Sequence, residues 1–126
     1  MGKGFELTRE ISMIPGAAIS QYRFVKVDTT AYRCIQGTAG ADAIGVSRES
    51  AAAAGDPAIP ITILDGCKCI VEAGAAVAAG AAVMSDSTGR AITATVGLRI
   101  LGYAIDAAAA AGEHVTVIVN KGGLSA

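Results

Sequence analysis

The sequence is short of the residues from which enzymes and cofactor-dependent proteins build their sites. It has no tryptophan, one histidine and three cysteines, and only 4% of its residues are aromatic. It contains neither a glycine-rich dinucleotide or phosphate loop nor a Gly-x-Ser-x-Gly elbow. Cys67 and Cys69 would need a third and a fourth ligand to hold zinc, and His114 is the only histidine. We therefore expect no enzyme: no catalytic residue, no cofactor and no metal.

Long apolar runs and an excess of one charge are also missing. No stretch is long and uncharged enough to cross a membrane as a helix. The first residues carry charge early, at Lys3 and Glu6, and no apolar run of about 7–15 residues follows, so we expect no export signal and synthesis in a host cytoplasm. The net charge is −1 with both signs scattered, which argues against a nucleic-acid partner. We expect no membrane partner either.

The cysteines Cys34, Cys67 and Cys69 are odd in number. Cys67 and Cys69 lie two residues apart on a predicted strand, so both side chains point to one face and are poorly placed to bond each other. We expect free thiols, as in a reducing compartment.

Small residues dominate what is present, since alanine and glycine make up about a third of the chain. A chain of 126 residues forms one domain with a real core. Small side chains, however, give thin packing layers and bury little apolar surface for each residue. This composition favours an oligomer or a protein that is bound to a larger surface. We predict a symmetric homo-oligomer, a trimer before a dimer.

The sequence repeats its own layout. Gly16-Ala17-Ala18-Ile19 matches Gly74-Ala75-Ala76-Val77, and the turn at Asp28 and Thr30 matches the turn at Asp86 and Thr88. After a shift of one residue, the run from Ala51 to Gly55 matches the run from Ala108 to Gly112. The sequence therefore predicts two pseudo-repeats, at about residues 16–64 and 74–119.

Alternation of apolar and polar residues predicts strands throughout. The Asp65-Gly66 pair is a strong hairpin signal between two of them. The expected strands are Ile19–Val27, Ala31–Gln36, Ala43–Arg48, Ile59–Leu64, Cys67–Glu72, Ala81–Ser85, Ala91–Thr95, Leu98–Ile105 and His114–Val119. The fold class is therefore all-β, a small barrel or sandwich built from two pseudo-repeated halves.

Two alanine runs, after Ser50 and after Asp106, have helical propensity but are too short for stable helices. We predict one or two single-turn helices there, or else tight loops. Most carboxylates occupy turn positions. Glu72 is the exception, at the end of an apolar strand, and no catalytic partner can be named for it.

Both ends of the chain lie outside the predicted repeat. We expect residues 1–15 to form an N-terminal arm, residues 16–120 the all-β domain and residues 121–126 a flexible tail. The arm carries spaced apolar side chains that a soluble protein would not expose without a use, so it could dock on a sister subunit or another partner. The alternative is an extra edge strand of the barrel. The candidate docking residues are Phe5, Leu7, Ile11 and Met13.

The small-residue pattern resembles the Ala/Gly-rich capsid decoration (cement) proteins of tailed bacteriophages. The carrying residues are the run from Val71 to Val83, the turn from Asp86 to Ala91, and the segments 100–104 and 112–117. The resemblance implies a structural protein of the virion that binds the major capsid protein on the outside of the expanded head. It would stabilise the shell against internal pressure. It implies no catalytic residue.

Two alternatives stay open. The run Gly74-x-x-Val77-x-x-Gly80-x-x-Val83 also resembles the half-motif of biotinyl and lipoyl carrier domains, which present a modified lysine at a hairpin tip. Lys68 follows Asp65-Gly66, and Lys26 lies in an apolar strand, but neither has the expected flanking residues. The second alternative is a tail or fibre component of the same class of virus.

Overall fold

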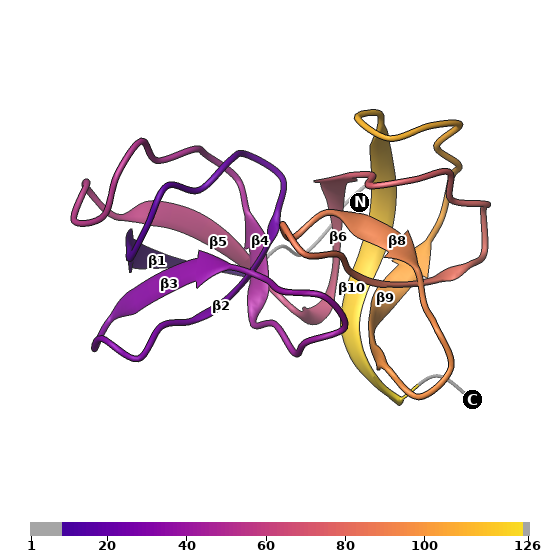
Figure 1. The fold of residues 1–126 in the computed structure, drawn as a ribbon, viewed down its shortest axis with the longest axis horizontal. Coiled ribbons are helices and arrows are strands. Elements are labelled where there is room, and N and C mark those ends of the chain that lie inside the picture. Colours follow the sequence, from indigo (N-terminus) through magenta and orange to yellow (C-terminus); the bar gives the residue numbers. More distant parts are fainter. Residues whose placement is uncertain (1–8, 125–126) are drawn as a thin grey trace, which may run out of the picture.

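The computed structural model describes residues 9–124, and within this range it contains ten strands and no helix. The all-β prediction is confirmed (Figure 1). The first five strands are β1 (Glu10–Pro15), β2 (Phe24–Val27), β3 (Arg33–Gln36), β4 (Gly45–Ser47) and β5 (Ile59–Ile63). The other five are β6 (Asp65–Glu72), β7 (Ala82–Ser85), β8 (Ala91–Thr93), β9 (Arg99–Ala104) and β10 (His114–Leu124).

The strands form two lobes that lie side by side (Figure 1). Strands β1–β5 close into a barrel in the order β1-β3-β2-β4-β5, which we call the N-terminal barrel. Strands β6–β10 form a five-stranded sheet in the order β6-β10-β9-β7-β8, which we call the C-terminal sheet. The two orders are the same if β6–β10 take the places of β1–β5. The parallel β1–β3 pairing of the barrel has its counterpart in a single parallel bridge between Ala73 and Ala91.

The register of the strands confirms that the halves are repeats. Gly45 pairs with Val25 in the barrel, and Gly102 pairs with Val83 in the sheet. Isolated antiparallel bridges also recur, between Ile19 and Ala51 and between Val77 and Ala108. These matching positions are therefore 57 or 58 residues apart along the chain.

The repeat begins earlier than the sequence indicated, because β1 is the counterpart of β6. Residues 10–15 were expected to belong to an arm outside the β domain, yet they pair with β5 in antiparallel and with β3 in parallel. They thereby close the barrel, so the alternative of an extra strand is correct in kind, although β1 pairs on both sides and is not an edge strand. The sequences of β1 and β6 share almost no residue types, so only the pairing shows the correspondence. Residues 1–8 of the predicted arm lie outside the described residues.

Two further expectations need correction. The predicted tail begins inside β10, which continues to Leu124 and pairs there with β9. Asp65-Gly66 is not a hairpin turn, because β5 belongs to the barrel and β6 to the sheet. Gly66 has a left-handed φ of 78° and lies where the β6–β10 register shifts by a β-bulge. The carboxylate of Asp65 forms an ion pair with Arg9, 2.9 Å away.

The alanine runs form tight loops, the second of the two predicted forms. Backbone N–H groups of Ala52 and Ala53 donate to the carboxylate of Asp56, and that of Ala109 donates to Glu113. These side chains satisfy the loop backbone, so no helical hydrogen bonds are needed.

The core has two parts. One lies inside the barrel and contains Ile19, Val25, Cys34, Ile59 and Ile61. The larger part combines the valines of β10 and β6 with four barrel residues that point out of the barrel: Phe24, Ala43, Val46 and Leu64. Because this second cluster draws on both lobes, burial of apolar surface holds the lobes together.

Candidate functional site

The two lobes meet where the sheet lacks a strand pairing that the barrel has. In the barrel β1 pairs with β3, whereas the corresponding strands of the sheet, β6 and β8, are separated by a gap. In the barrel the N–H of Ile14 in β1 donates to the carbonyl of Tyr32, 3.1 Å away. Glu72 of the sheet is the repeat counterpart of Ile14, but its N–H donates to the carbonyl of Tyr22 in the barrel, 2.9 Å away. Residues 22–24 of the barrel therefore lie in the gap between β6 and β8.

The other side of this gap is bonded in the same way. The N–H of Phe24 donates to the carbonyl of Gly89, 2.7 Å away in the β7–β8 turn. A Cβ added at Gly89 would lie 2.7 Å from the carbonyl oxygen of Phe24, so only glycine allows this approach. The barrel thus supplies the backbone segment that completes the C-terminal sheet.

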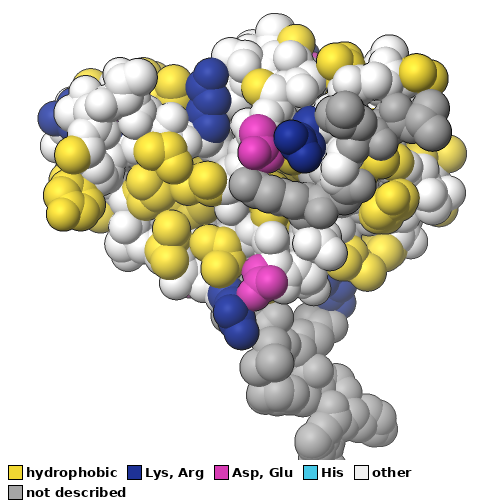
Figure 2. Space-filling model, turned by 90° about the horizontal axis from the view of Figure 1, so that it is seen from below, with side chains coloured by type: hydrophobic (Ala, Val, Ile, Leu, Met, Phe, Trp, Pro, Cys, Tyr) yellow, Lys and Arg dark blue, Asp and Glu magenta, His cyan; other side chains and the backbone are white. Residues whose placement is uncertain are grey.

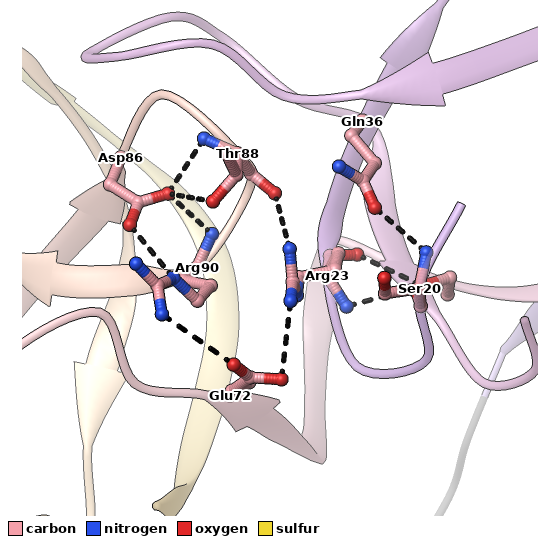
Figure 3. A network of polar contacts seen from close by, with 8 residues as sticks. Ser20, Arg23, Gln36, Glu72, Asp86, Thr88 and Arg90 are labelled. Carbon is pink, nitrogen blue, oxygen red and sulfur yellow. Dashed lines mark hydrogen bonds and ion pairs between the residues drawn. The ribbon is translucent and has the colours of Figure 1, made fainter. Parts of the chain in front are cut away.

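A chain of ion pairs crosses the same joint (Figure 3). The guanidinium of Arg23 lies 3.3 Å from the carboxylate of Glu72 and donates to the carbonyl of Thr88 at 3.0 Å. Glu72 also pairs with Arg90 at 3.7 Å, and Arg90 pairs with Asp86 at 3.2 Å. Glu72, for which the sequence offered no role, is therefore a structural residue that joins the lobes.

Asp86 is the best-bonded carboxylate of this chain of ion pairs. Burial acts to raise its pKa, but backbone N–H groups of Thr88 and Arg90, the Thr88 hydroxyl and the Arg90 guanidinium all donate to it. The hydrogen bonds outweigh burial, so the pKa of Asp86 lies below its ordinary value of 3.8.

We predict that Asp86→Asn lowers stability and flattens its dependence on acid pH. A depressed folded-state pKa adds stability above the ordinary pKa, and this stability is lost as the pH falls through the folded-state pKa. At neutral pH the substitution should cost about 1–3 kcal/mol in the free energy of unfolding. Thermal melts between pH 2 and pH 7 would measure both effects. Asp28→Asn is the matched control, because Asp28 is the repeat counterpart and its carboxylate accepts hydrogen bonds from Thr29. Equal pH dependence of Asp86→Asn and the native protein would contradict the prediction.

The three cysteines are free thiols. Cys67 and Cys69 point to the interior side of β6, while Lys68 between them is exposed. Burial, and next the neighbouring Cys67, raise the pKa of Cys69 to about 12. Burial, and next Asp28, raise the pKa of Cys34. Thiols with such pKa values are poor nucleophiles at neutral pH.

The other expected chemical groups do not assemble into a site. Within residues 9–124, no three His, Cys, Asp or Glu side chains are placed to hold a metal ion. His114 is exposed and makes an edge-to-face contact with Tyr22, with ring centroids 5.0 Å apart. Lys68 lies in the middle of β6 and Lys26 within β2, so neither is at the hairpin tip that a carrier domain requires. In this part of the chain no helix is long and apolar enough to span a membrane.

A groove of about 580 Å³ separates the lobes on one side. One wall carries Glu10 and Arg48 of the barrel, which form an ion pair, and the other carries Ile70 and Thr116 of the sheet. The hydroxyl of Thr62 lies buried there without a hydrogen-bond partner in the described structure.

The predicted docking residues are not gathered in one patch. Phe5 and Leu7 lie outside the described residues. Ile11 is exposed on β1, and Met13 is half-buried against the core of the barrel. Hydrophobic side chains do gather in patches on both lobes, with few charges among them, when the molecule is seen from below (Figure 2).

A larger set of exposed apolar residues lies on the outer side of β6, β10 and β9. Ile118 pairs with Tyr103 across the strands, and Ile70 pairs with Thr116, whose carbonyl accepts the N–H of Ile105. Ile70, Tyr103, Ile105 and Ile118 are the exposed apolar residues, and together with the half-buried Thr116 we call them the β10 face. Sequence reasoning missed this face, although isoleucines at the outward positions of predicted strands are the signal for it.

The described part of the chain exposes apolar side chains on both lobes, and its three cysteines, Glu72 and His114 do not come together in one site. The family model for phage cement proteins matches residues 5–120. The chain therefore belongs to the phage cement protein family and is a structural protein of a phage, which confirms the resemblance seen in the sequence.

The fold is also shared with a phage protein of known structure. The head fiber gp8.5 N base of bacteriophage phi29 superposes with a TM-score of 0.75, over 95% of this chain and 100% of that chain. The two sequences are 15% identical, so this likeness shows the fold alone. No curated protein is significantly similar in sequence to this chain.

Proposed function

We propose that this protein binds the major capsid protein on the outer surface of a phage head and stabilises the shell against the pressure of packaged DNA. The observation that carries the proposal is the family match over residues 5–120. The exposed apolar surfaces are in keeping with a role that depends on contacts rather than on chemistry. We expect no enzymatic turnover.

Many weak contacts suit this role better than one deep pocket. A shell presents the same binding site many times, so a symmetric oligomer can engage several sites at once and gain avidity without any new contact. We propose a homotrimer, which matches threefold positions of an icosahedral shell. Phe5, Leu7, Ile11 and Met13 remain proposed docking residues, on a sister subunit or on the capsid.

Co-sedimentation tests the proposal. The protein is mixed with expanded heads that lack it, and we expect it to pellet with expanded heads but not with unexpanded proheads. Heads carrying the protein should also retain their DNA at a higher temperature or after a stronger osmotic shock than bare heads. Protein that stays in the supernatant, or that pellets without raising the temperature of DNA release, would overturn the binding or the stabilising part, respectively.

A second candidate function is the base of a fibre on the virion. The likeness in fold to the N base of a head fiber favours it. Electron microscopy of decorated heads distinguishes the two, since a fibre base would carry a projecting partner chain and a decoration protein would form a low knob.

A further inference from the structure

The groove between the lobes runs along an open strand edge. β6 is an edge strand of the C-terminal sheet and lies next to the barrel (Figure 1). Three consecutive residues of β6 line the groove: Lys68, Cys69 and Ile70. Alternate side chains of a strand point to opposite faces, so consecutive residues border one groove where the strand turns its main-chain edge toward it. The groove therefore gives access to the main chain of β6.

The hydrogen bonds of β10 show which main-chain groups of β6 face the groove. Thr116 donates its N–H to Asp106 at 2.8 Å, and its carbonyl accepts the N–H of Ile105 at 2.9 Å, so both groups point toward β9. Thr116 lies opposite Ile70 in the antiparallel pair of β10 and β6. In such a pair, opposite residues exchange both hydrogen bonds or neither. Ile70 therefore directs its N–H and its carbonyl away from β10.

The next residue of the same alternation confirms this direction. Glu72 lies opposite His114, and its N–H donates to the carbonyl of Tyr22 in the barrel instead of to β10. Within the part of the chain that the structure describes, neither the N–H nor the carbonyl of Ile70 has a hydrogen-bond partner. The barrel thus completes the edge of β6 at Glu72 and leaves it open at Ile70, where the groove lies.

Two residues of the barrel indicate that the groove receives a partner. The hydroxyl of Thr62 is buried there and has no hydrogen-bond partner among residues 9–124, so a polar group that enters the groove would supply one. Tyr22, which also lines the groove, has a left-handed φ of 64°, whereas its repeat counterpart is Gly80, with a φ of 85°. Glycine adopts this backbone without strain, and strained residues cluster at binding sites.

An extended polypeptide segment is the ligand that these groups fit. The N–H and the carbonyl of a residue on an open strand edge are matched by the carbonyl and the N–H of an added strand. Residues 22–24 of the barrel already bind the sheet in this way, since Tyr22 accepts from Glu72 and Phe24 donates to Gly89. The volume of about 580 Å³ lies within the range of about 300–1,000 Å³ in which proteins enclose ligands. The side chain of Ile70, 40% exposed, offers an apolar contact beside the open edge.

We propose that an extended segment of the major capsid protein adds to the open edge of β6 and pairs with the main chain of Ile70. This partner follows from the proposed function, on which the inference rests. The edge lies in a groove whose opposite wall carries the ion pair of Glu10 and Arg48, so the same edge of a second copy cannot reach it. The partner segment must therefore project from its own protein as a loop or a terminus.

Amide hydrogen exchange of the native protein tests the pairing. The Ile70 amide should exchange at least about tenfold more slowly on expanded heads than in the free protein, because it gains a hydrogen bond only there. The amide of Val71 is the matched control, since Val71 pairs with Val115 of β10 and should be protected in both states. An Ile70 amide that exchanges equally fast on heads and in solution would overturn the inference.

The free protein separates the capsid segment from other occupants. Slow exchange at Ile70 in the free protein at every concentration would show that the protein's own chain covers the edge. Slow exchange that appears only as the concentration rises would show a second copy, and either result would overturn the inference. Protein that pellets with heads but leaves Ile70 unprotected would overturn this inference alone, whereas protein that does not pellet would overturn the proposed function as well.

Two variants of Ile70 provide a second measurement. Ile70→Pro removes the N–H that faces the groove, and proline is tolerated in an edge strand where the N–H points away from the ladder. Ile70→Ala is the control, because it removes the side chain and keeps the N–H. We expect folded Ile70→Pro to need at least about tenfold more protein than Ile70→Ala to saturate heads. Equal saturation by the two variants, both with a retained melting transition, would overturn the inference. The exchange measurement needs no variant, so it decides the matter even where proline prevents folding.

Discussion

Deletion of residues 2–13 is expected to abolish the cooperative thermal unfolding of this protein. The deletion removes most of β1, which pairs with Ile59 to Thr62 of β5 on one side and leads into the pairing with β3 on the other. The barrel would be left with two unpaired strand edges and an exposed core at Ile59 and Ile61. Differential scanning calorimetry and near-UV circular dichroism would measure the loss.

The shorter deletion of residues 2–8 is the control, because it leaves every residue of β1 in place. We expect it to keep a cooperative transition. This pair of variants also separates folding from docking, since a folded deletion of 2–8 that no longer binds heads would support Phe5 and Leu7 as docking residues. A cooperative, native-like melt of the 2–13 deletion would contradict the place of β1 in the barrel.

Gly45→Ala and Gly102→Ala are each expected to destabilise the protein by about 3 kcal/mol, a reduction in Tm on the order of 10 °C. These glycines hold equivalent places in β4 and β9. A Cβ at Gly45 would clash with the carbonyl of Thr62, and one at Gly102 would lie 2.5 Å from the carbonyl of Ile118. Backbone atoms of a paired strand cannot move aside as a flexible side chain could.

Gly80→Ala is the matched control for these two variants. Gly80 has a left-handed φ of 85°, but nothing lies within 4 Å of the position of its Cβ. It should therefore cost only the conformational strain of about 1–2 kcal/mol. Chemical denaturation curves would give the three values, and a loss at Gly45 or Gly102 no larger than at Gly80 would show that the strands can separate to admit a methyl group.

Much of the fold could be predicted from periodicity and turn residues. Nine of the ten strands were expected close to where they lie, and the Asp-x-Thr turns correctly indicated a repeat. The tenth strand, β1, was expected only as the alternative to an arm, because it contains Glu10, Ser12 and Pro15 and lacks the glycine and alanine signals of the rest of the repeat. Its place depends on partners about 20 and 50 residues away, which local pattern does not reveal.

The surfaces were harder to predict than the strands. The sequence pointed to the apolar residues of an arm, because they stood outside the recognised repeat. The β10 face escaped notice because Ile70, Tyr103 and Ile118 read as ordinary strand residues, and only the sheet order places them side by side. The joint at Arg23 and Glu72 was hidden for the same reason, since it brings together residues 49 positions apart.

The gap between β6 and β8 of the C-terminal sheet has a consequence for the order in which the chain folds. The barrel needs only residues up to Ile63 to close, so it can form while the rest of the chain is still being synthesised. The C-terminal sheet cannot be completed until residues 22–24 are held in place, because they fill the gap between Glu72 and Gly89. The first repeat thus serves as a template for the second, and the slow step of folding should be the docking of the late strands on a finished barrel.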